Sequence, residues 1–214
     1  MKKLMDAMRV SVLFEGIKET ELESLVENGG VRVQAFQKDQ FLIHQGDKAK
    51  GVGLVLEGRL HILREDFLGN REILAEATAG DIFDEVYAIL QGEPQSVAVA
   101  AASDGQVAFF STERLLENRE VMGNMIKVLA RKNLFLTRKM SHLSRKTIRE
   151  KLISYLSEEG SRQGSADIHI PFNRQQLADY LSVERSALSR ELSKMKDEEM
   201  IWFYKDHFLL YNIK

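Results

Sequence analysis

Five side chains that can bind DNA recur along one face of a predicted helix near the C-terminal end of the sequence: Arg185, Ser186, Ser189, Arg190 and Lys194. Arg185 and Ser189 are four residues apart, so they lie on consecutive turns. The same spacing separates Ser186 from Arg190. An arginine fork matches O6 and N7 of guanine, and a serine hydroxyl both donates and accepts. The spacing therefore predicts a helix that reads base edges in the major groove, with contact to phosphates alone as the alternative.

This helix is the second of a predicted helix-turn-helix over residues 173–196. Two apolar stripes define the pair: Leu177, Ala178 and Leu181 in the first helix, and Leu188, Leu192 and Met195 in the second. Asn173 can cap the first helix, and a break at Ser182-Val183 separates the two. Arg174 and Gln175, at the start of the first helix, complete the expected DNA-binding set. Short helix pairs with charged outer faces are also common packing units, so periodicity alone leaves the function open.

Composition narrows the possible classes of protein. The chain has 214 residues, 44% of them hydrophobic, which is enough for two modest cores. The absence of cysteine excludes disulfides, thiolate zinc sites and iron-sulfur clusters, and with no signal peptide it fits a bacterial cytoplasm. No apolar run is long enough for a membrane span. The net charge of −2 means that DNA affinity must come from local basic groups, and residues 173–196 hold five basic against three acidic residues. This modest excess favours two copies acting together.

The N-terminal part of the chain changes its pattern at about residue 30. Residues 1–28 have helical spacing and predict one or two short helices. Beyond them, short β-rich runs alternate with glycines, which predicts a small antiparallel barrel or sandwich. The expected strands are 31–36, 41–44, 53–56, 59–63, 72–74, 96–101 and 107–110, with Glu57-Gly58 closing a hairpin. The run Asp84 to Leu90 predicts a short helix within this domain, a plausible ligand cradle.

The longest helical pattern runs without interruption from about Thr112 to Leu143. Apolar residues recur in it at steps of four and three, the spacing of a coiled-coil seam. Asn133 within the stripe is typical of a polar pair that fixes register across a two-fold axis. We therefore predict a homodimer, and the alternative is one amphipathic helix lying on its own barrel. The expected interface residues are Met122, Ile126, Leu129, Asn133, Leu136 and Met140.

The remaining segments complete a DNA-binding domain of the winged type. Ser144 and Arg145 mark a hinge, a helix restarts over residues 147–156, and Gly160 to Ala166 is expected as a loop. Met200 to Asn212 predicts two short strands around Lys205-Asp206. The expected domains are residues 1–111 for effector sensing, 112–143 for dimerisation and 144–214 for DNA binding.

This order of elements resembles the Crp-Fnr family of transcription regulators over nearly the whole chain. The resemblance rests on Leu13-Phe14, Ile17, Gly46-Asp47, Leu56-Glu57-Gly58, Gly80 to Phe83, Glu85 and, most specifically, RSALSREL at Arg185 to Leu192. It implies an α+β fold: an N-terminal antiparallel β-roll (double-stranded β-helix), a long dimerisation helix and a C-terminal winged helix-turn-helix. The roll's ligand state would set the spacing of two reader helices on a palindromic promoter site. The implied partners are double-stranded DNA and RNA polymerase.

The resemblance also assigns roles within the reader helix. It implies a guanine-reading arginine at Arg190, and it usually places a glutamate where this chain has Ser186. A serine hydroxyl is shorter than a glutamate and both donates and accepts, so the base preference there should be weaker or redirected.

The chain departs from the family at the effector site. Members that bind cyclic AMP resemble one another in a Gly-Glu pair for the ribose and an Arg-Ser pair for the phosphate, and this chain has Asp84-Glu85 and Gln95-Ser96 there. Asp84 adds a carboxylate, and Gln95 lacks the cation that holds a phosphate, so cyclic-nucleotide binding is disfavoured. The expected effector is an unidentified small molecule, and the expected lining is Asp84, Glu85, Tyr87, Gln95, Ser96 and Asn133. A regulator that needs no effector is the alternative.

Other function classes find less support. Haem could bind through His44 or His61, but lone histidines on strands are usually ordinary surface or core residues. No phosphate loop, dinucleotide fingerprint or HExxH is present, and the five histidines lack ligand spacing, so we expect neither an enzyme nor a bound cofactor or metal. A signalling module that controls a protein partner would have the barrel but would not need a DNA-reading helix. The intact face at Arg185 to Leu192 therefore argues against this class.

Overall fold

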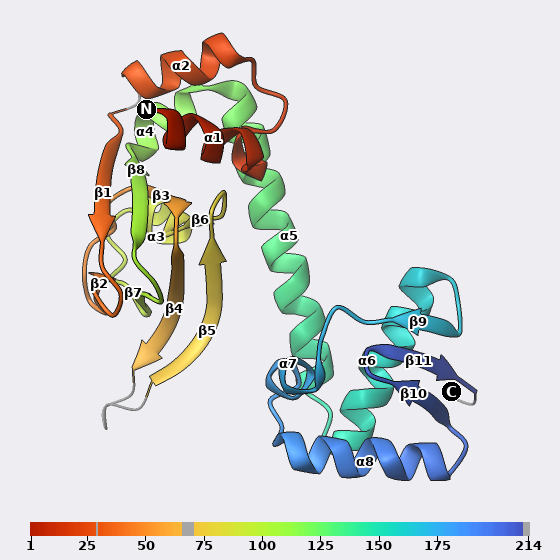
Figure 1. Cartoon of the computed structure of the whole chain (residues 1–214). Helices are drawn as coiled ribbons and strands as arrows, with labels where there is room; N and C mark the ends of the chain where they lie inside the picture. The colour runs from red at the N-terminus through yellow and green to blue at the C-terminus, as the bar shows by residue number, and fades with distance from the viewer. Residues whose placement is uncertain (29, 66–70, 212–214) are drawn as a thin grey trace. The chain divides into compact units, whose positions relative to one another are not determined.

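The computed structural model describes residues 1–28, 30–65 and 71–211 (Figure 1). The chain forms two compact units, Met1–Leu129 and Ala130–Lys214, and the boundary falls inside helix α5 (Arg119–Leu143). The fold is α+β, with two N-terminal antiparallel sheets, a long helix and a C-terminal winged helix-turn-helix, as the sequence predicted. Within the described ranges, no helix has both the length and the apolar character needed to cross a bilayer.

The first unit is built on two four-stranded antiparallel sheets, which form the roll. One sheet has the strand order β1-β8-β3-β6 and the other β2-β7-β4-β5. The bounds are β1 Arg32–Phe36, β2 Phe41–Ile43, β3 Val52–Glu57, β4 Arg59–Glu65, β5 Arg71–Thr78, β6 Ile82–Phe83, β7 Ala98–Ala101 and β8 Gly105–Phe110. All seven predicted strands are confirmed, and β6 is an addition too short to show a pattern.

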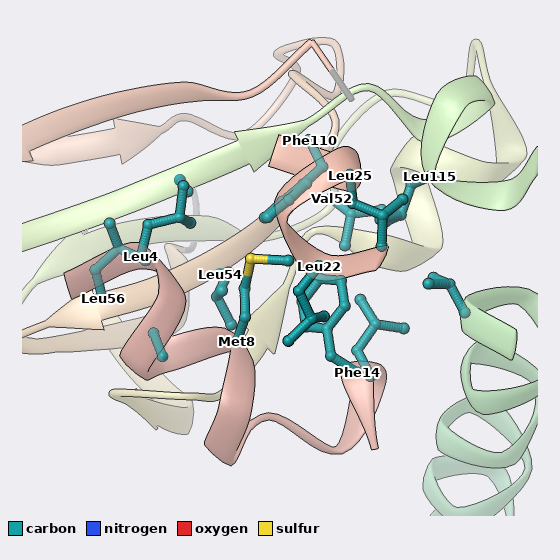
Figure 2. Packing of buried hydrophobic residues seen from close by; sticks show 14 of the residues in the cluster. Leu4, Met8, Phe14, Leu22, Leu25, Val52, Leu54, Leu56, Phe110 and Leu115 are labelled. Carbon is teal, nitrogen blue, oxygen red and sulfur yellow. The ribbon is translucent and has the colours of Figure 1, made fainter. Parts of the chain in front are cut away.

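Strands β3 and β8 are buried on both faces over most of their length. Side chains alternate across a strand, so Val55 enters the core between the two sheets while Leu54 enters a second core under the N-terminal helices. Figure 2 shows this second core, where Met8 and Phe14 meet Leu54 and Phe110. It fixes the N-terminal helices α1 (Lys2–Val10) and α2 (Glu19–Asn28), with the short 3-10 turn η1 (Val12–Phe14) between them.

The turn at Glu57-Gly58 was expected to close a hairpin, and that prediction is wrong. Strand β3 pairs with β6 and β8, whereas β4 pairs with β5 and β7, so the turn carries the chain from one sheet to the other. Gly58 has φ +86°, and a Cβ there would lie 2.4 Å from the carbonyl oxygen of Asp104. Glycine is thus required at this corner because the backbone of another turn passes close by.

The expected uninterrupted helix over 112–143 is in fact two helices. Helix α4 (Thr112–Glu117) ends at Asn118, whose backbone is extended, and α5 begins at Arg119. The Asn118 side chain accepts a hydrogen bond from the backbone N–H of Val121 at 3.0 Å. Asparagine favours this capping conformation over a helix interior, so it separates the two helices.

The second unit packs α6 (Ile148–Gln163), α7 (Arg174–Tyr180) and α8 (Arg185–Asp197) with a three-stranded sheet of order β10-β11-β9. The strands are β9 Asp167–His169, β10 Ile201–Tyr204 and β11 His207–Leu210. The two strands around Lys205-Asp206 are confirmed. The loop expected over 160–166 is wrong for its first four residues, because α6 continues to Gln163 and ends at Gly164 in a left-handed conformation. An ion pair between Glu159 and Arg162, three residues apart, supports this last turn.

Candidate DNA-binding surface and effector site

Helix α7 begins directly after Asn173, the residue that the sequence predicts as its cap. The Asn173 side chain accepts from the backbone N–H of Gln176 at 3.0 Å, and the Gln176 side chain accepts in return from the backbone N–H of Asn173 at 2.9 Å. This reciprocal capping box satisfies two N–H groups that a helix start otherwise leaves without partners. Leu177 and Ala178 are fully buried and fix the helix in the core of the second unit.

Helix α8 presents a polar face because its apolar stripe is wholly enclosed. Leu188, Leu192 and Met195 have no exposed surface. Ser182 turns the chain between the helices with φ 50°, which places the break where the sequence predicted it. The opposite face of α8 is therefore held outward by the packing of the second unit.

The expected base-reading residues share this outward face. Arg185, Ser186, Arg190 and Lys194 are exposed, and Ser189 is half-buried. Gln175 on α7 is exposed and donates to Asp179 at 2.8 Å. The arrangement brings two arginines and a lysine together on the helix that the motif places in the groove, and their DNA contacts remain predictions.

Glu184 is a residue of this face that the sequence reasoning missed. It caps α8: its carboxylate accepts from the backbone N–H of Ser186 at 2.9 Å and of Ala187 at 3.0 Å. The hydroxyl of Ser186 also donates to it. The hydrogen bond from that hydroxyl is the main cause that lowers the pKa of Glu184. Ser186 therefore has its proton engaged, and a carboxylate lies beside it at the start of the reader helix. An acidic residue at the helix cap position was the available signal.

Arg174 lies differently from its neighbours in the expected set. Its guanidinium is half-buried over the ring of Phe203 in the wing, at 4.9 Å from the ring centroid. Burial lowers its pKa, and the nearby Arg185 lowers it further. This packing ties α7 to β10 through a cation-π contact, so Arg174 has a positioning role that the sequence did not indicate.

A second missed residue, Arg149 on α6, holds the reader helix in place. Its Nε donates to Glu191 at 2.5 Å, and its two terminal nitrogens donate to Glu198 at 2.6 and 3.0 Å. These hydrogen bonds raise the pKa of Arg149. Because the contact with Glu198 is bidentate, it fixes direction as well as distance between α6 and α8. Residues so far apart in the sequence leave no local signal.

The candidate effector site lies at the start of helix α3 (Glu85–Leu90). Asp84 precedes the helix with φ 64°, and its carboxylate accepts a hydrogen bond from the side-chain amide of Gln95. Burial raises the pKa of Asp84 to about 6, against the opposing effect of that hydrogen bond. Asp84, which stands in the pair expected at the ribose, and Gln95, which stands in the pair expected at the phosphate, are therefore hydrogen-bonded to each other.

The other expected lining residues fall into three environments. Glu85 and Gln95 are buried. The hydroxyl of Tyr87 shares a hydrogen bond with the Ser96 hydroxyl and accepts from its backbone N–H at 3.2 Å. Asn133 is exposed on the part of α5 that belongs to the second unit, so its role at the effector site remains a prediction.

The two histidines weighed as haem ligands have ordinary surroundings. The ring of His44 stacks on Phe41 with centroids 4.9 Å apart, and His61 is 3.3 Å from the carboxylate of Glu76. In the described ranges, no group of three histidine, aspartate or glutamate side chains is arranged to hold a metal ion.

Helix α5 has two apolar stripes with opposite environments. Val121, Met125 and Val128 are buried in the first unit. Of the expected seam, Met122, Ile126, Leu136 and Met140 are exposed by 43%, 61%, 56% and 69%, while Leu129 is partly buried and Asn133 is exposed. Apart from Leu129, the packing of α5 on the first unit therefore uses other residues than the predicted seam, and Met122 and Ile126 stay exposed.

Comparison with known proteins finds two family models in the order of the two units. Residues 33–119 match the cyclic nucleotide-binding domain, and residues 150–212 match the Crp-like helix-turn-helix domain. The cyclic AMP receptor protein of Thermus thermophilus is 24% identical over 197 residues, which covers 91% of this chain and 89% of that protein. The probable transcriptional regulator flp of Lacticaseibacillus casei is 26% identical over 179 residues, covering 84% and 78%.

A solved structure has the same fold at low sequence identity. CprK in complex with OCPA aligns with a TM-score of 0.62 and 18% identity, and the alignment covers 90% of this chain and 92% of that one. The two family models together span more than half of the chain, and the relatives match across both. By its sequence and its fold, this chain belongs to the Crp-Fnr family of DNA-binding transcription regulators.

Proposed function

We propose that the protein binds a palindromic promoter site as a homodimer, with α8 of each protomer in the major groove. The observation that carries this is the outward face of α8, where Arg185, Arg190 and Lys194 are exposed while the opposite stripe is fully buried. A helix held in this way can enter the groove without disturbing its own core. The two half-sites are expected about one helical turn, roughly 34 Å, apart.

The dimer is proposed to form along the predicted seam of α5. Met122, Ile126 and Met140 are large apolar side chains that remain in water in a single chain. A partner helix would remove them from water, which stabilises the dimer by about 25 cal/mol for each Å² of apolar surface that becomes buried. Asn133 would fix the register of the two helices. Under this proposal residues 1–111 sense an effector, 112–143 dimerise and 144–214 bind DNA.

Within the reader helix, Arg190 is proposed to read one guanine per half-site through its fork. Ser186 is an exposed hydroxyl whose proton is directed to Glu184, so it offers a base only acceptor capacity. The Glu184 carboxylate accepts hydrogen bonds and repels phosphate, so a base amino group is the partner it favours. The preference beside the guanine is therefore for a cytosine or adenine amino group.

The effector is proposed to be a small molecule other than a cyclic nucleotide. A phosphate would have to displace the hydrogen bond between Gln95 and Asp84 and lie beside a partly buried carboxylate, and Gln95 offers it no cation. Because that pair satisfies itself without a ligand, a regulator that needs no effector is the second candidate. A thermal-shift screen against metabolites separates the two, since a ligand of the native state raises the melting temperature.

We further propose that the protein acts on RNA polymerase and that it is located in the cytoplasm. A regulator bound at a promoter acts by changing the activity of the polymerase at that promoter. The regulator and the polymerase must therefore share a compartment with the DNA. These two proposals rest on membership of the family.

Selection of binding sites from a random DNA pool tests the proposal. Wild-type protein should enrich a two-fold site, and Arg190→Ala should lose the preference for one guanine in each half-site, at a cost of about 1 to 3 kcal/mol. Arg59→Ala removes the same charge from an exposed position of the first unit and should leave the selected sequence unchanged. An Arg190→Ala pool with the wild-type sequence preference and uniformly lower affinity would mean that Arg190 contacts only phosphate.

A further inference from the structure

A cleft of about 600 Å³ lies within the second unit and is separate from the reading face. Its walls come from α5, α6, the segment before α7 and the end of α7, and its lining includes Phe135, His142, Tyr155, Glu158, Phe172 and Tyr180. This volume is within the range of surface clefts that hold small molecules. The cleft belongs to none of the expected DNA, dimer or effector surfaces.

Four phenylalanine and tyrosine side chains of the lining lie close together. The ring centroid of Tyr180 is 4.9 Å from that of Phe172, 5.4 Å from that of Tyr155 and 5.8 Å from that of Phe135. Phe135 is 49% exposed, and Phe172 and Tyr180 are half-buried, so ring surface remains uncovered. Uncovered rings in a concave site favour a planar aromatic partner, which stacks on a face or packs against an edge.

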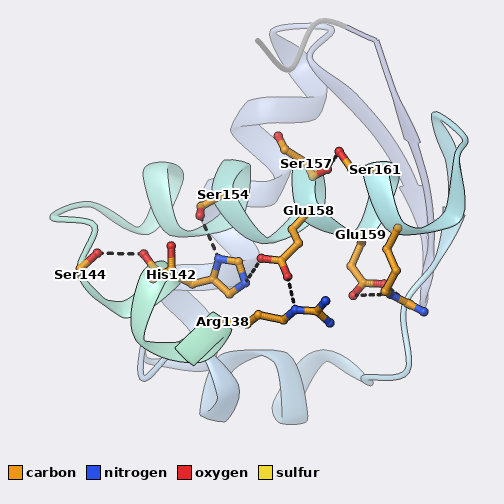
Figure 3. A network of polar contacts seen from close by, with 10 residues as sticks. Arg138, His142, Ser144, Ser154, Ser157, Glu158, Glu159 and Ser161 are labelled. Atoms are coloured by element: carbon orange, nitrogen blue, oxygen red, sulfur yellow. Dashed lines mark hydrogen bonds and ion pairs between the residues drawn. The ribbon is translucent and has the colours of Figure 1, made fainter. Parts of the chain in front are cut away.

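The charged groups of the lining are already matched with one another. Glu158 is 2.9 Å from Arg138 and 3.4 Å from Nε2 of His142, and Glu159 is 2.5 Å from Arg162 (Figure 3). Burial lowers the pKa of His142 and so favours its neutral ring, although Glu158 acts in the opposite direction. An ionic ligand would meet no unmatched charge among these groups, and its desolvation would have no compensation. The balance favours an uncharged ligand.

One buried side-chain oxygen of the lining has no hydrogen-bond partner among the described residues. Tyr155 is 3% exposed, and its hydroxyl oxygen is buried with no hydrogen bond. Leaving such a group unsatisfied costs free energy, and buried polar groups in native proteins are nearly always paired. A ligand with one hydrogen-bonding group that reaches this hydroxyl would supply the missing partner.

We propose that this cleft is a binding site for a planar, uncharged aromatic molecule with a single hydrogen-bonding group. The rings of Phe172 and Tyr180 would cover its apolar surface, and the Tyr155 hydroxyl would bond to its polar group. Because the walls join the C-terminal half of α5 to α6 and α7, the occupant would set the angle between α5 and the helix-turn-helix. That regulatory consequence rests on the proposed function, whereas the binding itself does not.

The test uses 2-naphthol, which is planar and uncharged at pH 7 and has one hydroxyl, with the full-length protein. Its fluorescence on titration gives the dissociation constant. Two related probes isolate the chemistry: naphthalene lacks the hydroxyl, and naphthalene-2-sulfonate replaces it with a charge. Tyr155→Phe removes only the orphan hydroxyl, Phe135→Ser removes an exposed ring, and Tyr211→Phe is the matched control because Tyr211 is an exposed tyrosine outside the cleft.

We expect saturable binding of 2-naphthol, weakened about five- to tenfold in Tyr155→Phe, the value of one hydrogen bond, and unchanged in Tyr211→Phe. Naphthalene should bind wild type and Tyr155→Phe alike, and Phe135→Ser should weaken both probes. No saturable binding at millimolar 2-naphthol, equal binding by wild type and both cleft variants, or tighter binding of the sulfonate would each overturn the proposal. A gel shift without probe tests DNA binding separately, so the two failures are distinguishable.

Discussion

Replacing Asp84 with asparagine removes a titrating carboxyl from the first unit while it preserves the local geometry. Asp84 has φ 64°, a left-handed conformation that asparagine also adopts. The amide oxygen of asparagine can still accept the hydrogen bond that Gln95 now donates to the carboxylate. Asp84→Asn therefore removes the titrating group and keeps the contact with Gln95, and it gives up the long hydrogen bond of 3.4 Å that the backbone N–H of Lys50 donates to the other carboxylate oxygen.

The expected effect follows from the raised pKa. Burial raises the pKa of Asp84 from its ordinary 3.8 to about 6, so the native state holds the proton more tightly than the unfolded chain. The carboxylate consequently destabilises the fold above about pH 6, and the penalty disappears as the pH falls below 3.8. A pKa difference of one unit corresponds to about 1.4 kcal/mol, so the rise from 3.8 to about 6 lowers the free energy of unfolding by about 3 kcal/mol. Because Asp84 is only partly buried, solvent screening reduces this penalty to about 1 to 2 kcal/mol.

Urea unfolding at two pH values measures this effect. Circular dichroism follows both units, and the fluorescence of Trp202 in β10, the one tryptophan of the chain, follows the second unit as an internal control. Asp84→Asn should raise the free energy of unfolding of the first unit by about 1 to 2 kcal/mol near pH 8, and by about half as much near pH 5. An equal gain at both values, or a gain in the Trp202 transition, would refute the reasoning.

Three further outcomes are expected. Leu136→Asp should turn the dimer into monomers in sedimentation at micromolar concentration, because an exposed seam residue would bring a carboxylate into the partner helix; a persistent dimer would show that the interface lies elsewhere. Calorimetry with millimolar cyclic AMP or cyclic GMP should be flat, because Gln95 offers no cation to a phosphate, and saturable heat at micromolar ligand would contradict this. Tyr155→Phe should raise the free energy of unfolding of the second unit by about 1 kcal/mol, as it removes an unpaired buried hydroxyl, and a lower Trp202 unfolding midpoint would mean that the hydroxyl has a partner.

The helix-turn-helix could be predicted in detail because its signals are local. The Asn173 side chain caps α7 by accepting a hydrogen bond from the backbone N–H of Gln176, three residues further along the chain. The apolar stripe of Leu188, Leu192 and Met195 repeats within one helix. The predicted seam of α5 is equally periodic, and its role as a dimer interface stays a prediction. Glu184 shows the limit of such reasoning: its capping contact is local, but a pattern built on exposed basic residues gives no weight to an acid.

What the sequence by itself determined were the elements and their order, since capping, glycine turns and hydrophobic period act over a few residues. Tertiary structure alone decided which elements meet. The turn at Gly58 links two sheets because β3 finds its partners in β6 and β8. Arg149 contacts Glu198, and Gln95 contacts Asp84, because the fold brings these residues together. The spacing of each pair in the sequence follows no helix or strand repeat, so the sequence does not indicate the contact. Long-range pairing depends on the closure of the whole core, and for that reason it has no signature in any one stretch of sequence.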